Sequence, residues 1–335
     1  MDVRRKRPPL ALVALCAPLL AGCGGNQNVL DPASGPQRAI VHLWWLMLAG
    51  AAVGFGSVVL LLFLGWARRD RAGLPGGGGE RRETALVVLL GVVVPVTVLV
   101  LLFAYANVFV LRSTAAPAPG STAMTIRVIG HQWFWEVRYP GTRAVTANEI
   151  HIPVGVRVDL VGTTDDVIHS VWIPELNRKV DLIPGRRNRI LLEADRPGRF
   201  RGQCSEFCGL QHAHMAVEVV AQPRARFRAW LASMSRPARA PATPLERRGE
   251  QVFLSNACSG CHEIRGTAAR GRLGPDLTHL ASRRMLAALT LPNRPADLAE
   301  WIADPGHAKP GAKMPALPLT ARQLHALVAY LESLR

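Results

Sequence analysis

Two long apolar runs stand out in the first third of the chain. The first covers residues 40–67 and the second covers residues 85–111, and neither contains an acidic residue, a lysine or an arginine. Each run exceeds the roughly 20 residues that a helix needs to cross a bilayer. We therefore expect two transmembrane helices, because buried helices of soluble proteins are usually much shorter.

The segments that flank these runs predict their orientation. Residues 68–84, between the runs, are rich in arginine and glycine. Loops on the cytoplasmic side of a membrane are enriched in basic residues, so a cytoplasmic loop is expected here. The segment before the first run, residues 23–39, and the chain from residue 112 onwards are then expected on the periplasmic side.

The N-terminal segment has the pattern of a lipoprotein signal peptide. Four basic residues among the first seven precede an apolar stretch that ends in the sequence LAGC at residues 20–23. A basic region followed by an apolar region is typical of secretory signals, and LAGC resembles the bacterial lipobox. We therefore expect residues 1–22 to be removed and Cys23 to be lipidated. The alternative is an ordinary secretory signal with a chance cysteine.

After the second apolar run the pattern changes to short runs of β-branched and aromatic residues. Residues 112–124 form an expected linker that is rich in alanine, proline, serine and threonine. Across residues 125–222 the short runs are separated by turn residues, such as the Pro-Gly pair at 140–141. Short strands at this spacing are typical of an antiparallel sandwich or barrel.

The last part of the chain has a helical pattern. A second expected linker, residues 223–243, leads to this part, residues 244–335. Thr320 and Gln323 have the spacing of a capping box, which marks the start of a helix. Three helices are expected here, at residues 245–254, 296–303 and 320–334. The predicted fold is therefore multi-domain, with a two-helix transmembrane hairpin, a β-sandwich domain and an all-α domain.

The charge of the chain excludes one class of partner. The formal net charge is +16, from 40 basic and 24 acidic residues. The excess is spread along the chain without a dense basic stripe, whereas proteins that bind nucleic acids cluster their positive charge. Nucleic acid is therefore not an expected partner.

The helical part contains the motif CSGCH, in which Cys258 and Cys261 precede His262. This is the attachment signature of c-type haem: the two thiols bond to the haem, and the histidine binds its iron. A thioredoxin-like pair or a chance match is the alternative. With the later segments GPDL and KMP, the order of motifs resembles class I cytochromes c. The resemblance makes Met314 the second axial ligand of the iron and Pro275 the residue that supports His262.

A second group of metal-binding side chains lies in the sequence CSEFCGLQHAHM, residues 204–215. A disulfide or a reactive thiol pair formed by Cys204 and Cys208 would leave His212 and Met215 unexplained. Thiolates, an imidazole and a thioether are together typical of copper sites. Two thiolates suit two copper ions that share bridging sulfurs, and a second imidazole must then come from elsewhere in the chain.

His169, in the segment DDVIHS, is the candidate for the second imidazole. With the segments GHQWFWEVRYP and KVDLIPGR and the two apolar runs, the pattern resembles subunit II of haem–copper cytochrome c oxidases over residues 37–222. The attached cytochrome domain makes the chain similar to subunit II of a caa3-type oxidase. The resemblance implies a cupredoxin-like fold for residues 125–222 and a binuclear copper centre, CuA, within it.

The resemblance also implies the ligands of CuA: two bridging thiolates, one imidazole for each copper ion, a weak thioether ligand and a weak backbone carbonyl ligand. The bridging thiolates are those of Cys204 and Cys208, and the imidazoles are those of His169 and His212. The thioether is that of Met215, and the backbone carbonyl is that of Glu206. In the family the Glu206 side chain also reaches a magnesium ion at the boundary with subunit I, and a plain surface glutamate is the alternative. His214 is expected not to bind copper.

Aromatic and histidine residues of the sheet region carry separate expectations. Trp133 matches the position at which electrons enter near the copper centre in the family. Phe134 and Trp135 are expected to pack against subunit I, and His131 and His151 are expected to be structural.

The resemblance implies an electron-input subunit of a terminal oxidase in the bacterial inner membrane. A donor cytochrome or a bc1-type complex would reduce haem c, and electrons would pass through CuA to haem a of subunit I, where oxygen is reduced to water and protons are pumped. Subunit I, subunit III and membrane lipid are the implied partners. The alternatives are the copper subunit of a nitric oxide reductase and a copper-delivery lipoprotein that uses Cys204 and Cys208 as thiols.

Overall fold

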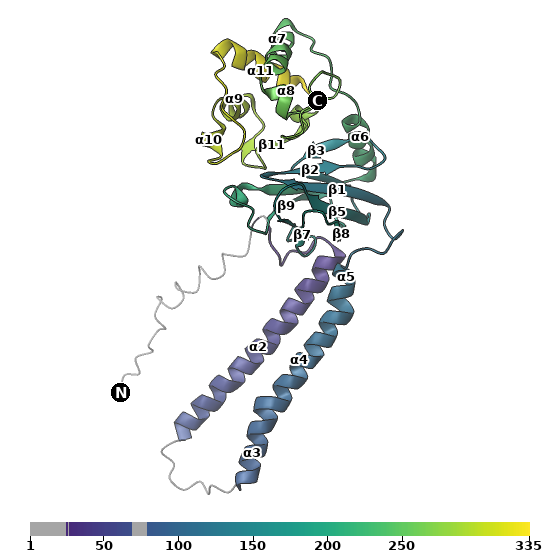
Figure 1. Ribbon diagram of the computed structural model, residues 1–335. Coiled ribbons are helices and arrows are strands. Elements are labelled where there is room, and N and C mark those ends of the chain that lie inside the picture. Colours follow the sequence, from purple (N-terminus) through teal and green to yellow (C-terminus); the bar gives the residue numbers. More distant parts are fainter. Residues whose placement is uncertain (1–24, 26, 69–78) are drawn as a thin grey trace, which may run out of the picture.

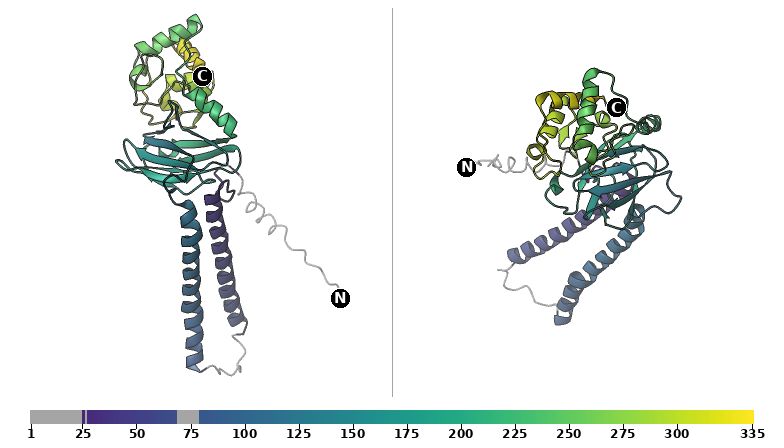
Figure 2. Two further views of the ribbon diagram at one scale, coloured as in Figure 1. Left: turned by 90° about the vertical axis from the view of Figure 1, so that its right-hand side faces the viewer. Right: turned by 45° about the horizontal axis from the view of Figure 1, so that its top comes forward.

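The computed structural model describes residue 25, residues 27–68 and residues 79–335. The expected signal peptide, Cys23 and most of the expected cytoplasmic loop lie outside the described residues. The described chain forms three tiers: a pair of long helices, a sheet domain (residues 124–222) and a helical domain (residues 244–335). The sheet domain lies between the other two (Figures 1 and 2).

The two apolar runs fold into two long helices that meet at the sheet domain (Figure 1). The first helix, α2, spans Gly35–Arg68. It begins before the predicted residue 40 because the Ser34 hydroxyl accepts a hydrogen bond from the backbone amide of Gln37 at 3.2 Å, which caps the helix. The second helix is continuous over Glu80–Thr114. It consists of α3 (Glu80–Val88), the π-helical turn η1 (Leu89–Val93), α4 (Val94–Tyr105), the π-helical turn η2 (Ala106–Leu111) and α5 (Arg112–Thr114).

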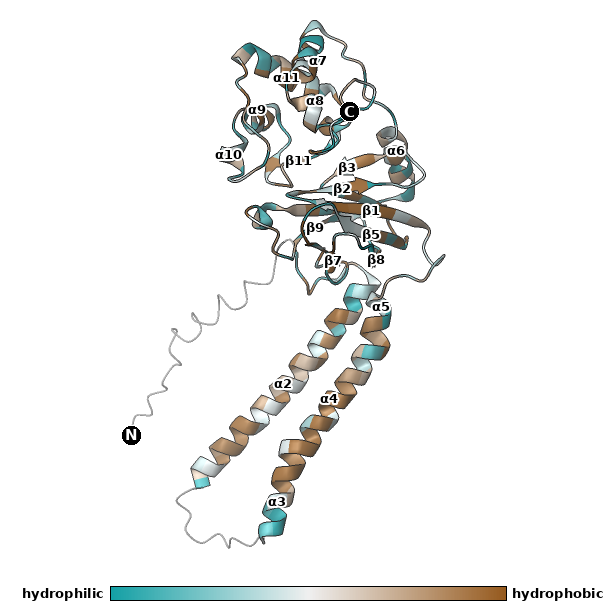
Figure 3. Cartoon of the chain, in the orientation of Figure 1, coloured by the Kyte–Doolittle hydropathy of each residue, from teal (hydrophilic) through white to brown (hydrophobic). Residues whose placement is uncertain are grey.

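Both long helices have the length and composition of membrane spans. Their most apolar windows have a mean hydropathy of 2.4 and 3.1, and no residue of these windows is buried by the rest of the described chain. Figure 3 shows apolar residues along most of both helices. A helix that is apolar on all sides needs an apolar environment around it, so the exposed surface agrees with the expected hairpin.

The sheet domain contains ten strands in two five-stranded sheets. One sheet has the order β3-β2-β1-β5-β8 and the other has the order β4-β10-β9-β6-β7. The strands are β1 (Met124–His131), β2 (Phe134–Arg138), β3 (Val145–Ala147), β4 (Glu149–Pro153), β5 (Val158–Thr164), β6 (His169–Trp172), β7 (Val180–Leu182), β8 (Asn188–Leu192), β9 (Gly198–Cys204) and β10 (Ala216–Gln222).

The expected β-sandwich is confirmed by the two sheets, but the sheets are mixed, so the expectation that its strands pair antiparallel was wrong for one strand pair in each sheet. Strand β1 pairs in parallel with β5, and β10 pairs in parallel with β4. Short turns force only consecutive strands to run antiparallel, whereas β1 and β5 are separated by three strands and can pair in either direction. The inward side chains of both sheets form one core, in which Ile126, Trp135 and Val219 are fully buried.

The expected linker at residues 223–243 is partly a helix. Residues Arg224–Met234 form α6, which packs against the sheet domain. The Trp230 ring stacks on the His151 ring at 3.9 Å between centroids, and Phe227 is buried against the same core. Aromatic side chains of the expected linker therefore add to the core of the sheet domain, and His151 has the structural role that was expected.

The three helices expected in the helical domain are present as α7 (Pro244–Ser255), α9 (Pro295–Ala303) and α11 (Ala321–Ser333). Thr320 and Gln323 form the predicted capping box, and Thr243 and Glu246 form a second one. The shorter elements are α8 (Cys258–Cys261), the 3-10 turn η4 (Leu280–Ser282), β11 (Met285–Leu286), β12 (Leu291–Pro292) and α10 (Pro305–Ala308).

Candidate metal centre and haem cavity

Strand pairing brings two distant candidate ligands together. His169 is the first residue of β6, and Cys204 is the last residue of β9. These strands pair antiparallel, with Val171 opposite Cys204. The Nδ1 atom of His169 therefore lies 3.9 Å from the Sγ atom of Cys204, although 35 residues separate them in the chain.

The copper loop, residues 204–215, folds back over the same point. The Sγ atom of Cys208 lies 3.8 Å from the Sγ atom of Cys204. It also lies 3.7 Å from Nδ1 of His212 and 3.9 Å from Sδ of Met215. The backbone carbonyl oxygen of Glu206 lies 3.2 Å from the Cys204 sulfur. All six donor groups expected from the sequence are thus gathered around two cysteine sulfurs.

The donor set suits copper and does not form a disulfide. A disulfide bond is about 2.05 Å long, whereas the two sulfurs are 3.8 Å apart and both cysteines are free. His169, Cys204 and Cys208 are all buried, and their donor atoms lie within 4.8 Å of one another. Soft thiolate and thioether ligands together with imidazoles are the set that copper favours, so the residues present fit this metal.

The two thiols affect each other's ionisation. Hydrogen bonding with Cys208 lowers the pKa of the Cys204 thiol, and the hydrogen bond with His169 lowers it further. The same contact raises the pKa of Cys208. One proton of the pair therefore leaves readily at neutral pH, and the resulting thiolate is the form that binds a metal.

The ring of His169 is oriented by neighbours outside the donor set. Its Nε2 atom lies 2.9 Å from Oδ1 of Asp166, which leaves Nδ1 directed at Cys204. Burial alone would lower the pKa of His169, but the hydrogen bonds with Cys204 and Asp166 raise it. A Cβ atom at Gly130 would lie 2.8 Å from the His169 ring, so the ring occupies space that only glycine leaves.

The side chains of two other polar residues of the copper loop lie outside the donor set. The Glu206 carboxylate is partly exposed and lies 3.8 Å from the Lys179 ammonium. The His214 side chain is exposed and takes no part in the contacts around the two sulfurs.

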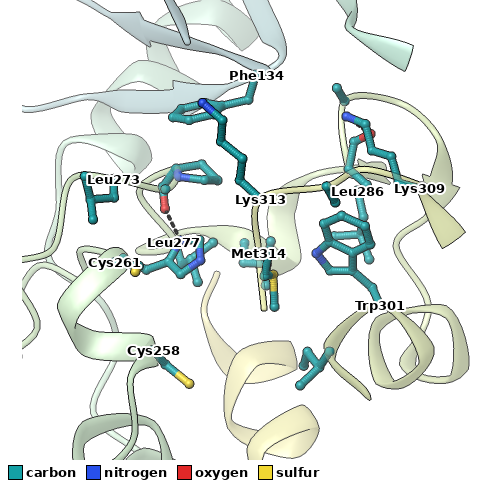
Figure 4. A pocket seen from close by; sticks show the side chains of 18 of the residues that line it. Phe134, Cys258, Cys261, Leu273, Leu277, Leu286, Trp301, Lys309, Lys313 and Met314 are labelled. Carbon is teal, nitrogen blue, oxygen red and sulfur yellow. Dashed lines mark hydrogen bonds between the residues drawn. The ribbon is translucent and has the colours of Figure 1, made fainter. Parts of the chain in front are cut away.

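A cavity of about 620 Å³ is lined mainly by the helical domain and on one side by residues of the sheet domain. Its wall contains both cysteines of the CSGCH motif, His262 and Met314. Figure 4 shows the side chains of Cys258, Cys261 and Met314 around this cavity. Sites for small molecules and cofactors are typically 300–1,000 Å³ and mostly apolar, so the volume, the free thiols and the two ligand types fit a haem.

His262 is held in one orientation beside the cavity. Its Nδ1 atom donates a hydrogen bond to the backbone carbonyl of Pro275 at 2.8 Å, which leaves Nε2 as the free nitrogen. Burial lowers the pKa of His262, so the ring is neutral and able to bind iron at neutral pH. A Cβ atom at Gly274 would overlap the His262 ring. Gly274 therefore leaves room for the His262 ring, and the Pro275 carbonyl fixes the orientation of that ring.

Two basic residues of the cavity wall were not anticipated from the sequence. Arg283 is 6% exposed and donates to the backbone carbonyl of Asp276, while its Nε atom has no partner among the described residues. Lys309 is 4% exposed. Arg283 and Lys309 are buried because segments that are distant in the sequence pack together around the cavity. The only signal in the sequence is the position of Arg283 inside the mainly apolar stretch LASRRMLAAL.

The aromatic segment lies between the two sites, and one expectation about it was wrong. Trp135 is fully buried in the core of the sheet domain, and Phe134 is stacked on His131 and faces the cavity. Neither side chain is free to pack against subunit I. Alternation along β2 cannot by itself tell a core residue from an interface residue, because both are apolar.

Trp133 and Gln132 contact both sites. Both side chains line the haem cavity. Trp133 Nε1 donates to the backbone carbonyl of Cys208 at 2.9 Å, and Gln132 Nε2 donates to the same carbonyl at 2.8 Å. The sequence singled out Trp133, whereas the adjacent glutamine carried no signal of its own.

Comparisons with known proteins agree with both sites. Residues 141–222 match the periplasmic domain of cytochrome c oxidase subunit II, and residues 246–335 match the cytochrome c family. The first match implies copper and the second implies haem c.

Curated relatives match along the whole chain. A cytochrome c oxidase subunit 2 of Alkalihalophilus pseudofirmus is 33% identical over 340 residues, which cover 98% of this chain and 96% of the relative. A cytochrome c oxidase subunit 2 of Bacillus subtilis is 26% identical and covers 97% of each chain. The solved periplasmic domain of subunit II of cytochrome oxidase from Bradyrhizobium japonicum is 30% identical, with a TM-score of 0.34, and the match covers 36% of this chain and 96% of that domain. This chain belongs to the cytochrome c oxidase subunit II family and carries a cytochrome c domain after its copper-site domain.

Proposed function

We propose that this chain accepts electrons at haem c and passes them through a CuA centre to subunit I of an oxidase that reduces oxygen to water and pumps protons. As a subunit II, the chain is part of an oxidoreductase complex of the membrane, with subunit I as its partner. The observation that carries the proposal is the pair of donor sets, haem-type and copper-type, that meet at Gln132 and Trp133.

In this proposal the helical domain holds haem c. When bound, haem c and CuA each supply a carrier for one electron. Cys258 and Cys261 would attach the haem covalently, and His262 and Met314 would bind its iron. The Pro275 carbonyl keeps the His262 ring in place through the 2.8 Å hydrogen bond. A histidine and methionine pair raises the potential of a haem.

The copper loop and β6 hold CuA in the same proposal. Cys204, Cys208, His169 and His212 would hold the copper ions, and two weak ligands would complete the site. The weak ligands are Met215 and the backbone carbonyl of Glu206. The sheets hold these groups on a rigid frame, as a precise metal site requires.

The remaining proposals concern the surroundings. The helix pair anchors the chain as a two-pass protein of the bacterial inner membrane, with both cofactor domains on the periplasmic side and Cys23 lipidated. The Glu206 carboxylate reaches a magnesium ion at the boundary with subunit I. A donor cytochrome or a bc1-type complex supplies electrons to haem c, and subunit III and lipid complete the assembly. Trp133 carries electrons towards the copper site.

The thiol-based alternative is less well supported. Thiols that exchange with other proteins are accessible, whereas Cys204 is 3% exposed and Cys208 is 2% exposed. The relatives that match along the whole chain are named as oxidase subunits, which favours oxygen over nitric oxide as the final acceptor.

Metal analysis and spectroscopy of the purified complex test the proposed function. We expect two copper ions and one low-spin haem c in this chain, with a mixed-valence copper signal by electron paramagnetic resonance. Two titratable thiols at Cys204 and Cys208 without near-infrared absorption would contradict the proposal and support the copper-delivery alternative. The Cys208→Ser variant should lose the mixed-valence signal, because it removes one of the two sulfurs proposed to hold the copper ions. It should keep the haem spectrum, because Cys208 is not part of the haem motif.

A further inference from the structure

The haem loop, residues 309–314, rests directly on the copper loop. Gly311 has a φ angle of +87°, and a Cβ atom at this position would lie 3.3 Å from the Cβ atom of Leu210. Glycine adopts this backbone conformation without strain and leaves room for the close approach. The two loops that carry the candidate ligands Met314 and Cys208 are therefore in contact across the domain boundary.

Lys313 connects the two loops through Gln132. The Nζ atom of Lys313 donates to Oε1 of Gln132 at 2.8 Å. The other end of the same amide, Nε2 of Gln132, donates to the backbone carbonyl of Cys208 at 2.8 Å. Lys313 immediately precedes Met314. Two hydrogen bonds thus link the neighbour of a haem ligand to a copper ligand.

The same lysine also contacts the proposed electron-entry residue. The Lys313 ammonium lies 5.3 Å from the centre of the Trp133 ring, within the range of a cation–π interaction. Lys309 approaches Trp133 as well, with Nζ 3.3 Å from its backbone carbonyl oxygen. Figure 4 shows Lys313 extending from the Met314 loop towards the side chain of Phe134. The haem loop therefore holds the aromatic segment from one side, and the Cys208 carbonyl holds it from the other.

We propose that Lys313 is a positioning residue for the transfer of one electron from the haem site, which is oxidised, to the copper site, which is reduced. Its ammonium fixes the haem loop against Gln132 and Trp133, and this contact sets the gap that the electron crosses. Small errors in the placement of reacting groups slow a reaction strongly, so a loosened contact slows this step. The inference rests on the proposed function, because it concerns the passage between the same two sites.

Flash reduction of haem c in the complete oxidase complex tests the inference. A photoactive ruthenium complex reduces the haem, and the absorption bands of haem and copper then report the internal transfer. We expect Lys313→Met to slow this transfer about tenfold, because a misplacement of reacting groups by about 1 Å can slow a reaction by up to about a hundredfold. Lys313→Arg, which keeps a cationic donor, should retain most of the rate.

Three controls separate positioning from general damage. Arg322→Met removes an exposed charge from α11 of the same domain and should leave the internal rate unchanged. The haem and copper spectra and the rate of haem reduction by the ruthenium complex should stay unchanged in Lys313→Met. Gln132→Leu should slow the transfer, and adding Lys313→Met to it should have little further effect, because both substitutions break one connection.

Two outcomes for the single variant Lys313→Met would overturn the inference: a parental internal rate, or a slower rate accompanied by altered haem or copper spectra. Additive effects of Lys313→Met and Gln132→Leu would also contradict it. Measurement of the unsubstituted complex distinguishes a failure of this inference from a failure of the proposed function. Absence of any haem-to-copper transfer in the parent would refute the proposed function itself.

Discussion

His169 illustrates how a single residue is prepared for its role. Its side chain is fully buried, and each ring nitrogen has a different neighbour: Asp166 at Nε2 and Cys204 at Nδ1. A carboxylate behind a metal-binding histidine orients the ring and raises its basicity. The candidate ligand was visible in the sequence as the histidine of DDVIHS, and the aspartate that orients it is part of the same segment.

Removal of the Asp166 charge should weaken copper binding without unfolding the sheet domain. For Asp166→Asn we expect copper affinity to fall about tenfold to a hundredfold, because substitutions behind a metal ligand typically have this effect. Competition with a chelator, followed by the near-infrared absorption of the copper site, measures the change. Asp165→Asn is the matched control, because Asp165 is exposed and does not contact His169. Equal copper loss in both variants would contradict the role assigned to Asp166.

Among the elements, α7 and α11 determine the packing of the helical domain. The Gly249 backbone in α7 lies against the Ala326 carbonyl and the Tyr330 side chain of α11, and a Cβ atom would overlap that carbonyl. The contact positions the walls of the haem cavity, since Phe253 of α7 and Leu327 of α11 both line it. A helix pattern in the sequence predicts both helices, but it does not predict the distance between them.

Gly249→Ala should destabilise the helical domain by about 1–3 kcal/mol, which is the usual cost of forcing an extra carbon into a packed contact. Chemical denaturation followed by haem absorption measures the free energy of unfolding of this domain. Gln251→Ala, at an exposed position of the same helix, should have little effect. If both variants unfold at the same denaturant concentration, the close contact between α7 and α11 is not what limits stability.

At the scale of the whole molecule, we expect the contact between the helical domain and the sheet domain to depend on pH. Burial lowers the pKa of Lys309 from its ordinary value of 10.5 to about 8. Between about pH 8 and pH 10.5, the Lys309 amine is less protonated when the two domains are in contact and bury it than when it is exposed to water. Closure therefore gains stability as the pH rises from about 8 towards 10.5, and below pH 8 the cost of burying the charge is fully present.

The internal electron transfer between haem and copper should follow this closure. We expect its rate to rise between about pH 8 and 10.5 in the parental complex, because a larger fraction of molecules is then closed. Lys309→Met removes the titrating amine and should abolish the rise. Flash reduction at a series of pH values measures both variants. A rise of the same size in Lys309→Met would assign the pH dependence to another group.

Much of this protein could be read from the order of its residues. Local spacing identified Cys258, Cys261 and His262, because the chemistry of haem attachment needs these residues next to one another in the chain. Unbroken apolar length identified the two long helices, because a membrane span is defined by its own composition. The four donor residues Cys204, Cys208, His212 and Met215 were visible for the same reason: they lie in one short loop.

Other features were decided only by the tertiary structure. The parallel pairing of β1 with β5 and the burial of Trp135 and Lys309 depend on segments that are distant in the sequence. The bridge from Lys313 through Gln132 to Cys208 joins residues 181 and 76 positions apart. The sequence by itself determined which groups can bind the cofactors, because each set is largely local. The tertiary structure decided how closely the two sites approach, because that distance depends on the packing of one domain against another.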